Sequence, residues 1–340
     1  MKRSIAAWMA LALALASGSP ALAQSQEFEA AFDRTLGTER RAPQTFNAVY
    51  QSSFERRIAE LANGDRGRIG VAAMDLATGE RIGVLDGQMF PMASTSKVAV
   101  AATFLELVEQ GKYSLTSEFP LLIPVSSARF SSAAAPVREG EYMSAHQLIE
   151  IMIARSSNPA TDALLRAVGG PRKVTDWMRR NGFTEFSIDR DIATLVRDDG
   201  EFDPASHVDK RDAATPREML DFLAALYQGK ILKPQSRQVL LDAMAKTRTG
   251  KRRIPAQMPE FVQVSHKTGS LSNTSSDIGI IEAPDGRAIA VAIYVTGQGS
   301  RAAREDRIAT IARALYDGFE QKARIAQPNW TNAERERPGG

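Results

Sequence analysis

The predicted strands of this chain fall into two groups that are far apart in the sequence. Residues 68–76 and 81–85 read as two strands joined by a short glycine-containing loop, as in a hairpin. Three more strands are expected at residues 261–266, 277–282 and 288–295. The two groups can share one sheet only if the chain between them is an insertion. The sequence therefore predicts an α/β (α+β) fold, with an antiparallel sheet of about five strands flanked by helices and an inserted all-helical subdomain.

Apolar residues recur at helical spacing in the rest of the chain. Ser144 begins one helix, and Gln147 three residues later completes a capping-box pattern. The stretch 189–215 is polar and acidic and lacks a period, so we expect a long surface loop there. Further helices are expected at residues 46–61, 94–111, 159–168, 216–226 and 301–319. The folded domain is placed at residues 45–323, with 45–111 and 216–323 as the α/β part and 112–215 as the helical insert.

The first residues have the pattern of a secretory signal peptide. Lys2 and Arg3 precede an apolar run over residues 5–16, and Ala21-Leu22-Ala23 supplies small residues for cleavage. The run is shorter than the roughly 20 residues that a membrane-spanning helix needs, and an uncleaved N-terminal anchor is the alternative. We therefore expect a periplasmic protein without a membrane span. The terminal segments are divided into a signal peptide (1–23), a leader (24–44) and a disordered tail (324–340).

Charge and composition argue against several classes of protein. Lys and Arg number 43 and Asp and Glu 40, which leaves a net charge of +3, and the basic residues form no stripe, so no nucleic-acid partner is expected. The absence of cysteine excludes disulfides and thiolate metal sites. His146, His207 and His266 belong to no motif of a Ser-His-Asp hydrolase or a zinc protease. His266 is expected to pack or to form a hydrogen bond rather than to act in catalysis.

Ser94 and Lys97 form an S-x-x-K motif at the start of a predicted helix. Their spacing places both side chains on one face of the helix, one turn apart. A serine hydroxyl needs a base before it can act as a nucleophile, and a lysine can serve if burial and a nearby cation lower its pKa. The motif alone is weak, because about one S-x-x-K is expected by chance and a serine-capped helix with an exposed lysine has the same sequence.

Two further motifs make this interpretation more specific. Ser156-Ser157-Asn158 lies just before a predicted helix of the insert, and Lys267-Thr268-Gly269 lies at the end of a predicted strand. S-x-x-K, S-D-N and K-T-G are the motifs of class A β-lactamases and penicillin-binding proteins, and this chain resembles that superfamily over roughly residues 46–319. The resemblance implies a monomeric serine hydrolase without a cofactor or a metal. Its small-molecule substrate would be a β-lactam or a D-Ala-D-Ala-like peptide.

The resemblance also implies a role for each motif residue. Ser94 would be the acylated nucleophile, Lys97 its proton acceptor, and Ser156 the group that passes the proton to the leaving nitrogen. Backbone N–H groups of Ser94 and Ser270 would form an oxyanion hole. Lys267 would supply positive potential, Thr268 would bind the substrate carboxylate and Asn158 the substrate amide. The expected substrate-binding residues are therefore Asn158, Lys267, Thr268, Gly269 and Ser270.

One part of the chain departs from the family pattern. Class A β-lactamases carry an E-x-x-L-N motif in a loop whose glutamate activates the water that cleaves the acyl-enzyme. Asp189-Arg190 and Asp212 resemble the ends of that loop, and Ile192 stands in the place of the glutamate. Ser157 replaces the central Asp of S-D-N, and Asp162 replaces an Asn that contacts the glutamate; two carboxylates there would repel each other. The candidate substitutes for the missing base are Asp191, Asp198, Asp199, Glu201 and Asp203.

Three functions remain open at this point. The first is a β-lactamase-type hydrolase that acylates Ser94 and deacylates with an altered base. The second is a penicillin-binding protein or D-Ala-D-Ala peptidase that releases β-lactams slowly. The third is a non-catalytic β-lactam-binding sensor. The signal peptide and the compact insert favour the first function, and Ile192 favours the second.

Overall fold

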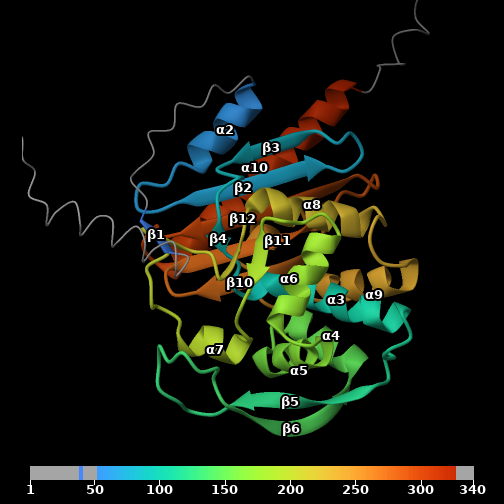
Figure 1. The fold of residues 1–340 in the computed structure, drawn as a ribbon. Coiled ribbons are helices and arrows are strands. Elements are labelled where there is room, and N and C mark those ends of the chain that lie inside the picture. Colours follow the sequence, from blue (N-terminus) through green and yellow to red (C-terminus); the bar gives the residue numbers. More distant parts are fainter. Residues whose placement is uncertain (1–37, 41–51, 327–340) are drawn as a thin grey trace, which may run out of the picture.

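The computed structural model describes residues 38–40 and 52–326. At its centre lies a five-stranded antiparallel sheet with the strand order β10-β11-β12-β2-β3 (Figure 1). Strand β12 pairs with β2, so the two predicted strand groups meet in one sheet, and the predicted fold class is confirmed. The strands are β2 Ile69–Asp75, β3 Arg81–Val84, β10 Gln263–Leu271, β11 Thr274–Glu282 and β12 Ala288–Thr296.

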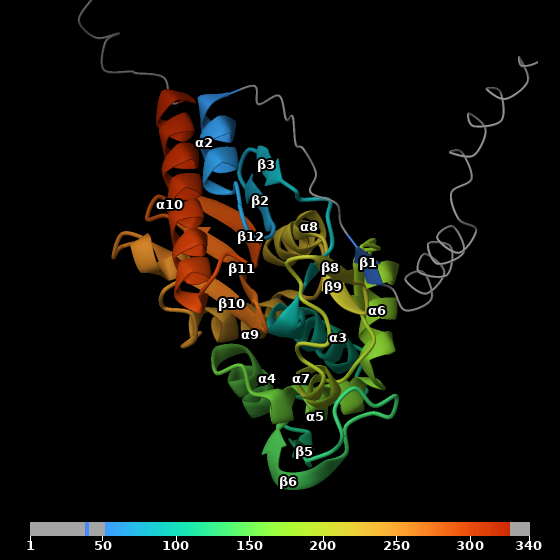
Figure 2. The same ribbon diagram turned by 90° about the vertical axis from the view of Figure 1, so that its left-hand side faces the viewer.

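Helices cover both faces of this sheet (Figure 2). Helices α2 Ser53–Leu61 and α10 Arg301–Ala326 pack on one face, and α8 Pro216–Tyr227 packs on the other. Successive side chains of a strand point to opposite faces, so Val71 of β2 belongs to the core under α10 and its neighbour Ala72 to the core under α8. Strand β2 is buried along its whole length for this reason.

The helical part of the chain is continuous with the core on the α8 side. In α4 the expected capping box is present: Ser144 Oγ accepts from Gln147 N, and the Gln147 side chain accepts from Ser144 N. Helix α5 ends at Gly169, whose φ of 100° is the left-handed conformation that glycine adopts most readily. The helices here are α3 Lys97–Glu109, α4 Ala145–Ala154, α5 Asn158–Val168, α6 Pro171–Arg180 and α9 Pro234–Ala245.

The insert differs from the all-helical subdomain that the sequence predicts. Strands β5 Glu118–Pro124 and β6 Val137–Ser144 form an antiparallel hairpin at its outer end (Figure 1). Proline cannot occupy a helix interior without loss of a hydrogen bond, and Pro120 and Pro124 both lie in β5. The hairpin was missed because its strands are only partly buried and lack a clear alternation.

The polarity of residues 189–215 predicts a long surface loop, but the structure differs from this prediction. This stretch contains the short helix α7 Ile192–Arg197 and the strands β8 His207–Asp209 and β9 Asp212–Ala214. Asp191 Oδ1 accepts from Thr194 N at 2.7 Å and so caps α7. Strand β9 lies between two other short strands in a second sheet. Its partners are β4 Phe90–Pro91 and β7 Phe186–Ile188.

The predicted bounds of the terminal segments stay a prediction, and the structure describes only part of these residues. Thr38–Arg40, within the expected leader, forms β1 and pairs with β8, so this part of the leader joins the fold. Helix α10 continues to Ala326, past the expected start of the tail at 324. The signal peptide, the rest of the leader and residues 327–340 lie outside the described residues. Within the described ranges, no helix is both long enough and apolar enough to span a bilayer.

Candidate active site

Ser94 lies in a short 3-10 helix, η1 Ala93–Ser96, which leads directly into α3. The preceding residue, Ala93, has a φ of 50°, a conformation that is uncommon for any residue other than glycine. Strand β10 approaches η1 so closely that a Cβ on Gly269 would lie 2.5 Å from Met92 O and 3.1 Å from Ala93 Cβ. Only glycine allows this approach. The glycine of the K-T-G motif therefore brings β10 against the segment that carries Ser94.

Lys97 is fully buried and connects α3 to the loop between α4 and α5. Its Nζ donates to Ser156 O at 2.8 Å, to Ser156 Oγ at 3.3 Å and to Asn158 Oδ1 at 2.7 Å. These bonds use the three donors of an ammonium group, and none of them goes to Ser94. Burial, together with the charge of Lys267, holds the pKa of Lys97 well below its usual value, although Asp162 opposes the shift. Lys97 can therefore lose a proton and become a base.

A second buried lysine contacts the same serine hydroxyl. Lys267 Nζ donates to Ser156 Oγ at 3.0 Å and to Thr268 O at 2.8 Å. Burial lowers the pKa of Lys267 to about 7, with Asp277 opposing the shift and Arg253 adding to it. The hydroxyl of Ser156 thus contacts two amines whose pKa values are both depressed. A hydroxyl in this position can pass a proton from one partner to another.

Strand β10 also carries contacts that the motifs did not predict. Thr249 Oγ1 lies 2.7 Å from Thr268 Oγ1. Arg253 is 1% exposed; its Nη1 donates to Gly269 O at 2.8 Å and its Nη2 to Ser270 Oγ at 2.6 Å. The only sequence signal for Arg253 is its place in a basic cluster, which a solvated surface patch would share. Its burial depends on packing between β10 and α10, which the local sequence does not reveal.

Asp162 of α5 holds the start of α7. Its Oδ1 accepts from Ile192 N at 2.7 Å and its Oδ2 from Ala193 N at 2.9 Å. An Asn side chain has one acceptor oxygen and one donor group, so Asp is better suited to two N–H donors. Burial raises the pKa of Asp162 to about 7; the two backbone hydrogen bonds and Lys97 oppose this shift, and Asp191 adds to it. The carboxylate of Asp162 thus has a structural role of its own, because it holds the start of α7.

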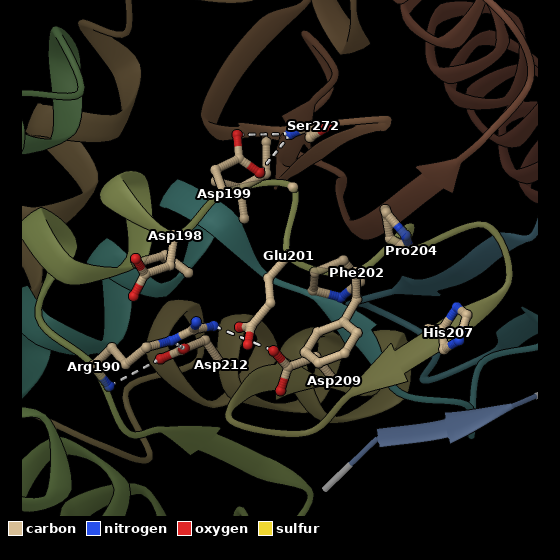
Figure 3. Close-up of a pocket in the computed structure, with 14 residues that line it drawn as sticks. Arg190, Asp198, Asp199, Glu201, Phe202, Pro204, His207, Asp209, Asp212 and Ser272 are labelled. Atoms are coloured by element: carbon tan, nitrogen blue, oxygen red, sulfur yellow. Dashed lines mark hydrogen bonds and ion pairs between the residues drawn. The ribbon is translucent and has the colours of Figure 1, made fainter. Parts of the chain in front are cut away.

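Several acidic residues of the segment 198–212 help to line a pocket of about 560 Å³, including space open to solvent, between this segment and the end of β10 (Figure 3). Arg190 Nε donates to Asp212 Oδ2 at 2.5 Å, so the two residues that resemble the loop ends are joined.

The candidate substitutes for a deacylation base all have partners: Asp191 caps α7, Asp198 pairs with Arg197, Asp199 accepts from Ser272 N, Glu201 pairs with Arg211, and Asp203 accepts from Asn273 Nδ2.

Five of the eight residues expected to form the site are hydrogen-bonded to one another. Hydrogen bonds join Lys97, Ser156, Asn158, Lys267 and Thr268 into one network. Packing places Gly269 beside the segment that carries Ser94. The next residue of β10, Ser270, accepts a hydrogen bond from Arg253 through its hydroxyl.

Outside this network, His266 Nδ1 lies 2.9 Å from Asp277 Oδ1 in the interior, which agrees with the hydrogen-bonding role expected for it. In the described residues, no cluster of three or more His, Asp or Glu is arranged to hold a metal ion.

A nucleophilic serine served by lysine instead of histidine is typical of serine hydrolases that act on β-lactams and related peptides. The family model described as "Beta-lactamase enzyme family" matches residues 53–319. The chain therefore belongs to the β-lactamase enzyme family, as a class A-like serine hydrolase.

Similar proteins agree with this assignment. Beta-lactamase L2 of Stenotrophomonas maltophilia is 33% identical over 226 residues, which cover 66% of this chain and 71% of that protein. Beta-lactamase SME-1 of Serratia marcescens is 29% identical over 274 residues, covering 79% of this chain and 90% of that protein. The structure of an ancestral class A β-lactamase of Gram-negative bacteria matches with a TM-score of 0.67 and 34% identity, over 78% of this chain and all of that one. The residues that the family model matches, 53–319, contain the sheet, the insert and the site.

Proposed function

We propose that this protein is a periplasmic serine hydrolase that opens the cyclic amide of β-lactams through an acyl-enzyme on Ser94. The observation that carries the proposal is the hydrogen-bonded connection from Lys97 through Ser156 Oγ to Lys267, next to the segment that presents Ser94. Membership of the β-lactamase family and relatives that bear β-lactamase names support it. The pattern of residues 1–23 supports the periplasmic location.

Acylation begins when neutral Lys97 takes the proton of Ser94 and Ser94 Oγ attacks the lactam carbonyl carbon. Backbone N–H groups of Ser94 and Ser270 bind the oxyanion, where one donor is worth about 3 kcal/mol. The ring C–N bond then breaks, and Ser156 Oγ passes a proton from Lys97 to the leaving nitrogen. The product is an ester on Ser94 and a free ring amine.

Binding of an anionic substrate rests on β10 and on the start of α5. Lys267 supplies positive charge beside Ser156, and Thr268, held by Thr249, donates to the substrate carboxylate. Asn158, whose amide oxygen accepts from Lys97, has its amide N–H₂ left for the substrate side chain. The substrate is thereby fixed on both sides of the reacting carbonyl.

Release of the acyl group is expected to be slow. Ile192, in the place of the usual glutamate, is 5% exposed and has no ionisable group. The neighbouring Asp162 uses both oxygens on backbone N–H groups of α7. This observation favours a second candidate function, a penicillin-binding protein or D-Ala-D-Ala peptidase whose β-lactam adduct persists. A sensor that binds β-lactams without turnover is the third.

Intact mass over time after addition of benzylpenicillin distinguishes these functions. We expect an adduct with the mass of benzylpenicillin that forms within minutes and disappears only over a much longer time. The reason is that the site contains a base for acylation, whereas Ile192 supplies no base for deacylation. The same chain unfolded in urea is the control, since it keeps the serine but lacks the network. A persistent adduct indicates a penicillin-binding protein, and no adduct on the folded protein contradicts both enzymatic functions for this ligand.

The acylation rate should depend on pH with a maximum near neutrality. As the pH rises, Lys97 loses its proton and becomes a base, because its pKa lies well below the usual value. Above pH about 7, Lys267 also loses its proton and its attraction for an anionic substrate, because its pKa is about 7. The rate should therefore rise and then fall, as measured by quenched-flow mass spectrometry between pH 5 and 9. In Lys267→Arg, whose cation persists, the fall above neutrality should vanish; an unchanged fall contradicts this assignment.

A further inference from the structure

Strand β10 is the outermost strand of the central sheet, so one of its edges lies open. Backbone groups of alternate residues in an antiparallel edge strand point away from the paired neighbour. Two contacts identify which residues of β10 do so: Thr247 Oγ1 donates to His266 O, and Lys267 Nζ donates to Thr268 O. Ser272, in the turn that follows β10, continues this alternation, because its N–H donates to Asp199. The even-numbered residues of β10 therefore turn their backbone groups to the open edge.

Ser270 lies on this edge between two positions that are already occupied. On one side Lys267 holds Thr268 O, and on the other Asp199 holds Ser272 N. An extended acyl chain on Ser94 would add to β10 as an antiparallel strand, which is a common mode of peptide binding. It would pair first with N–H and C=O of Ser270 and next, two residues along, with Ser272.

Asp199 occupies that second position with its carboxylate. Its Oδ1 and Oδ2 accept from Ser272 N at 2.8 Å and 2.9 Å; Figure 3 shows this contact above the acidic pocket. The guanidinium of Arg129 donates to Asp199 O from the loop between β5 and β6. A Cβ on Gly200 would lie 3.7 Å from Ser272 Oγ and 3.8 Å from Arg129 Nη2. Asp199 is thus held by Arg129 and by Ser272, at the end of the open edge of β10.

We propose that Asp199 is a specificity-determining residue that caps the open edge of β10 and restricts acyl pairing to Ser270. The inference rests on the proposed acylation of Ser94. A hydrogen bond to a carboxylate is stronger than one to a neutral carbonyl, so an incoming peptide carbonyl does not displace Asp199 from Ser272 N. The site accordingly selects compact acyl groups, such as bicyclic lactams, over extended peptidyl chains.

The test compares two acyl donors that end in the same lactate carboxylate and differ by one residue. In N-acetyl-D-Ala-D-lactate the acyl chain ends before Ser272, whereas in N-acetyl-L-Ala-D-Ala-D-lactate the acetyl carbonyl lies opposite Ser272 N. In each reaction Ser94 Oγ bonds to the D-Ala carbonyl carbon, and D-lactate leaves with the proton. The ratio of acylation rates, long ester over short ester, is followed by intact mass. We expect Asp199→Ala to raise this ratio about fivefold, the value of one freed hydrogen bond, and Asp199→Asn to raise it less.

Asp203→Ala is the matched control. Asp203 belongs to the same loop and accepts from Asn273 Nδ2 at 2.8 Å, in the same turn, but it leaves the backbone of β10 free. The ratio should stay at the wild-type value in this variant. An unchanged ratio in Asp199→Ala, or an equal rise in Asp203→Ala, overturns the inference while benzylpenicillin still acylates Ser94. If benzylpenicillin forms no adduct with the wild-type protein, the proposed function is overturned, and this inference with it.

Discussion

Lys97→Met is expected to slow acylation of Ser94 by benzylpenicillin about a thousandfold. A positioned general base contributes roughly 10²–10⁴-fold to a rate, and Lys97 is the amine with a lowered pKa one turn from Ser94. Methionine has a similar length but carries no base. The measurement is the rate constant of adduct formation at saturating benzylpenicillin, taken from intact mass, and Ser94→Ala should give no adduct at any time.

Lys267→Met is the matched control for this result. Both lysines are buried and both donate to Ser156 Oγ, so loss of a positive charge beside that hydroxyl is common to the two variants. Lys267→Met should act mainly on the benzylpenicillin concentration needed for half-maximal rate, because Lys267 attracts the anionic substrate. Equal losses of the saturated rate in both variants would show that Lys97 acts only through its charge.

The central sheet could be predicted because each of its strands can be recognised from its own stretch of sequence. Each strand shows its own apolar pattern, and the two strand groups can share one sheet if the chain between them is an insertion. The hairpin of β5 and β6 could not, because partly buried strands with prolines show no clear alternation. Helix α7 is short, and its stability comes from Asp191 and from Asp162, which is far away in sequence.

The residues of the site likewise divide into those that the sequence could predict and those that it could not. Spacing places Ser94 and Lys97 one helical turn apart, but the S-x-x-K motif became specific only together with the two further motifs. Their relation to Ser156 and Lys267 rested on the family resemblance, because those contacts join residues 59 and 111 positions apart in sequence. Thr249 and Arg253 were missed since no pattern distinguishes a buried arginine from its exposed neighbours. A single sequence does not show which residues are buried by segments far away in the chain.

Arg253→Ala is expected to lower the free energy of unfolding by about 3–5 kcal/mol, the usual cost of removing one partner from a buried ion pair. Arg253 is 1% exposed, and its Nη2 lies 3.1 Å from Glu305 Oε1. Its Nη1 also donates to Gly269 O and Ser276 O, each at 2.8 Å. The substitution leaves a largely buried carboxylate and removes a cation that joins β10 to α10. Urea unfolding followed by circular dichroism measures the change.

Arg252→Ala is the control, because Arg252 is the neighbouring arginine and is exposed. Its effect should stay within about 0.5 kcal/mol, as for most surface substitutions. Arg301 Nε donates to Glu305 Oε1 at 3.0 Å and compensates part of the loss in Arg253→Ala, so the double variant with Arg301→Ala should unfold more easily than the two single effects added together. If Arg253→Ala changes stability no more than Arg252→Ala does, Arg253 does not hold β10 in place. The position of Ser270 would then depend on the pairing of β10 with β11 and on the close packing of Gly269.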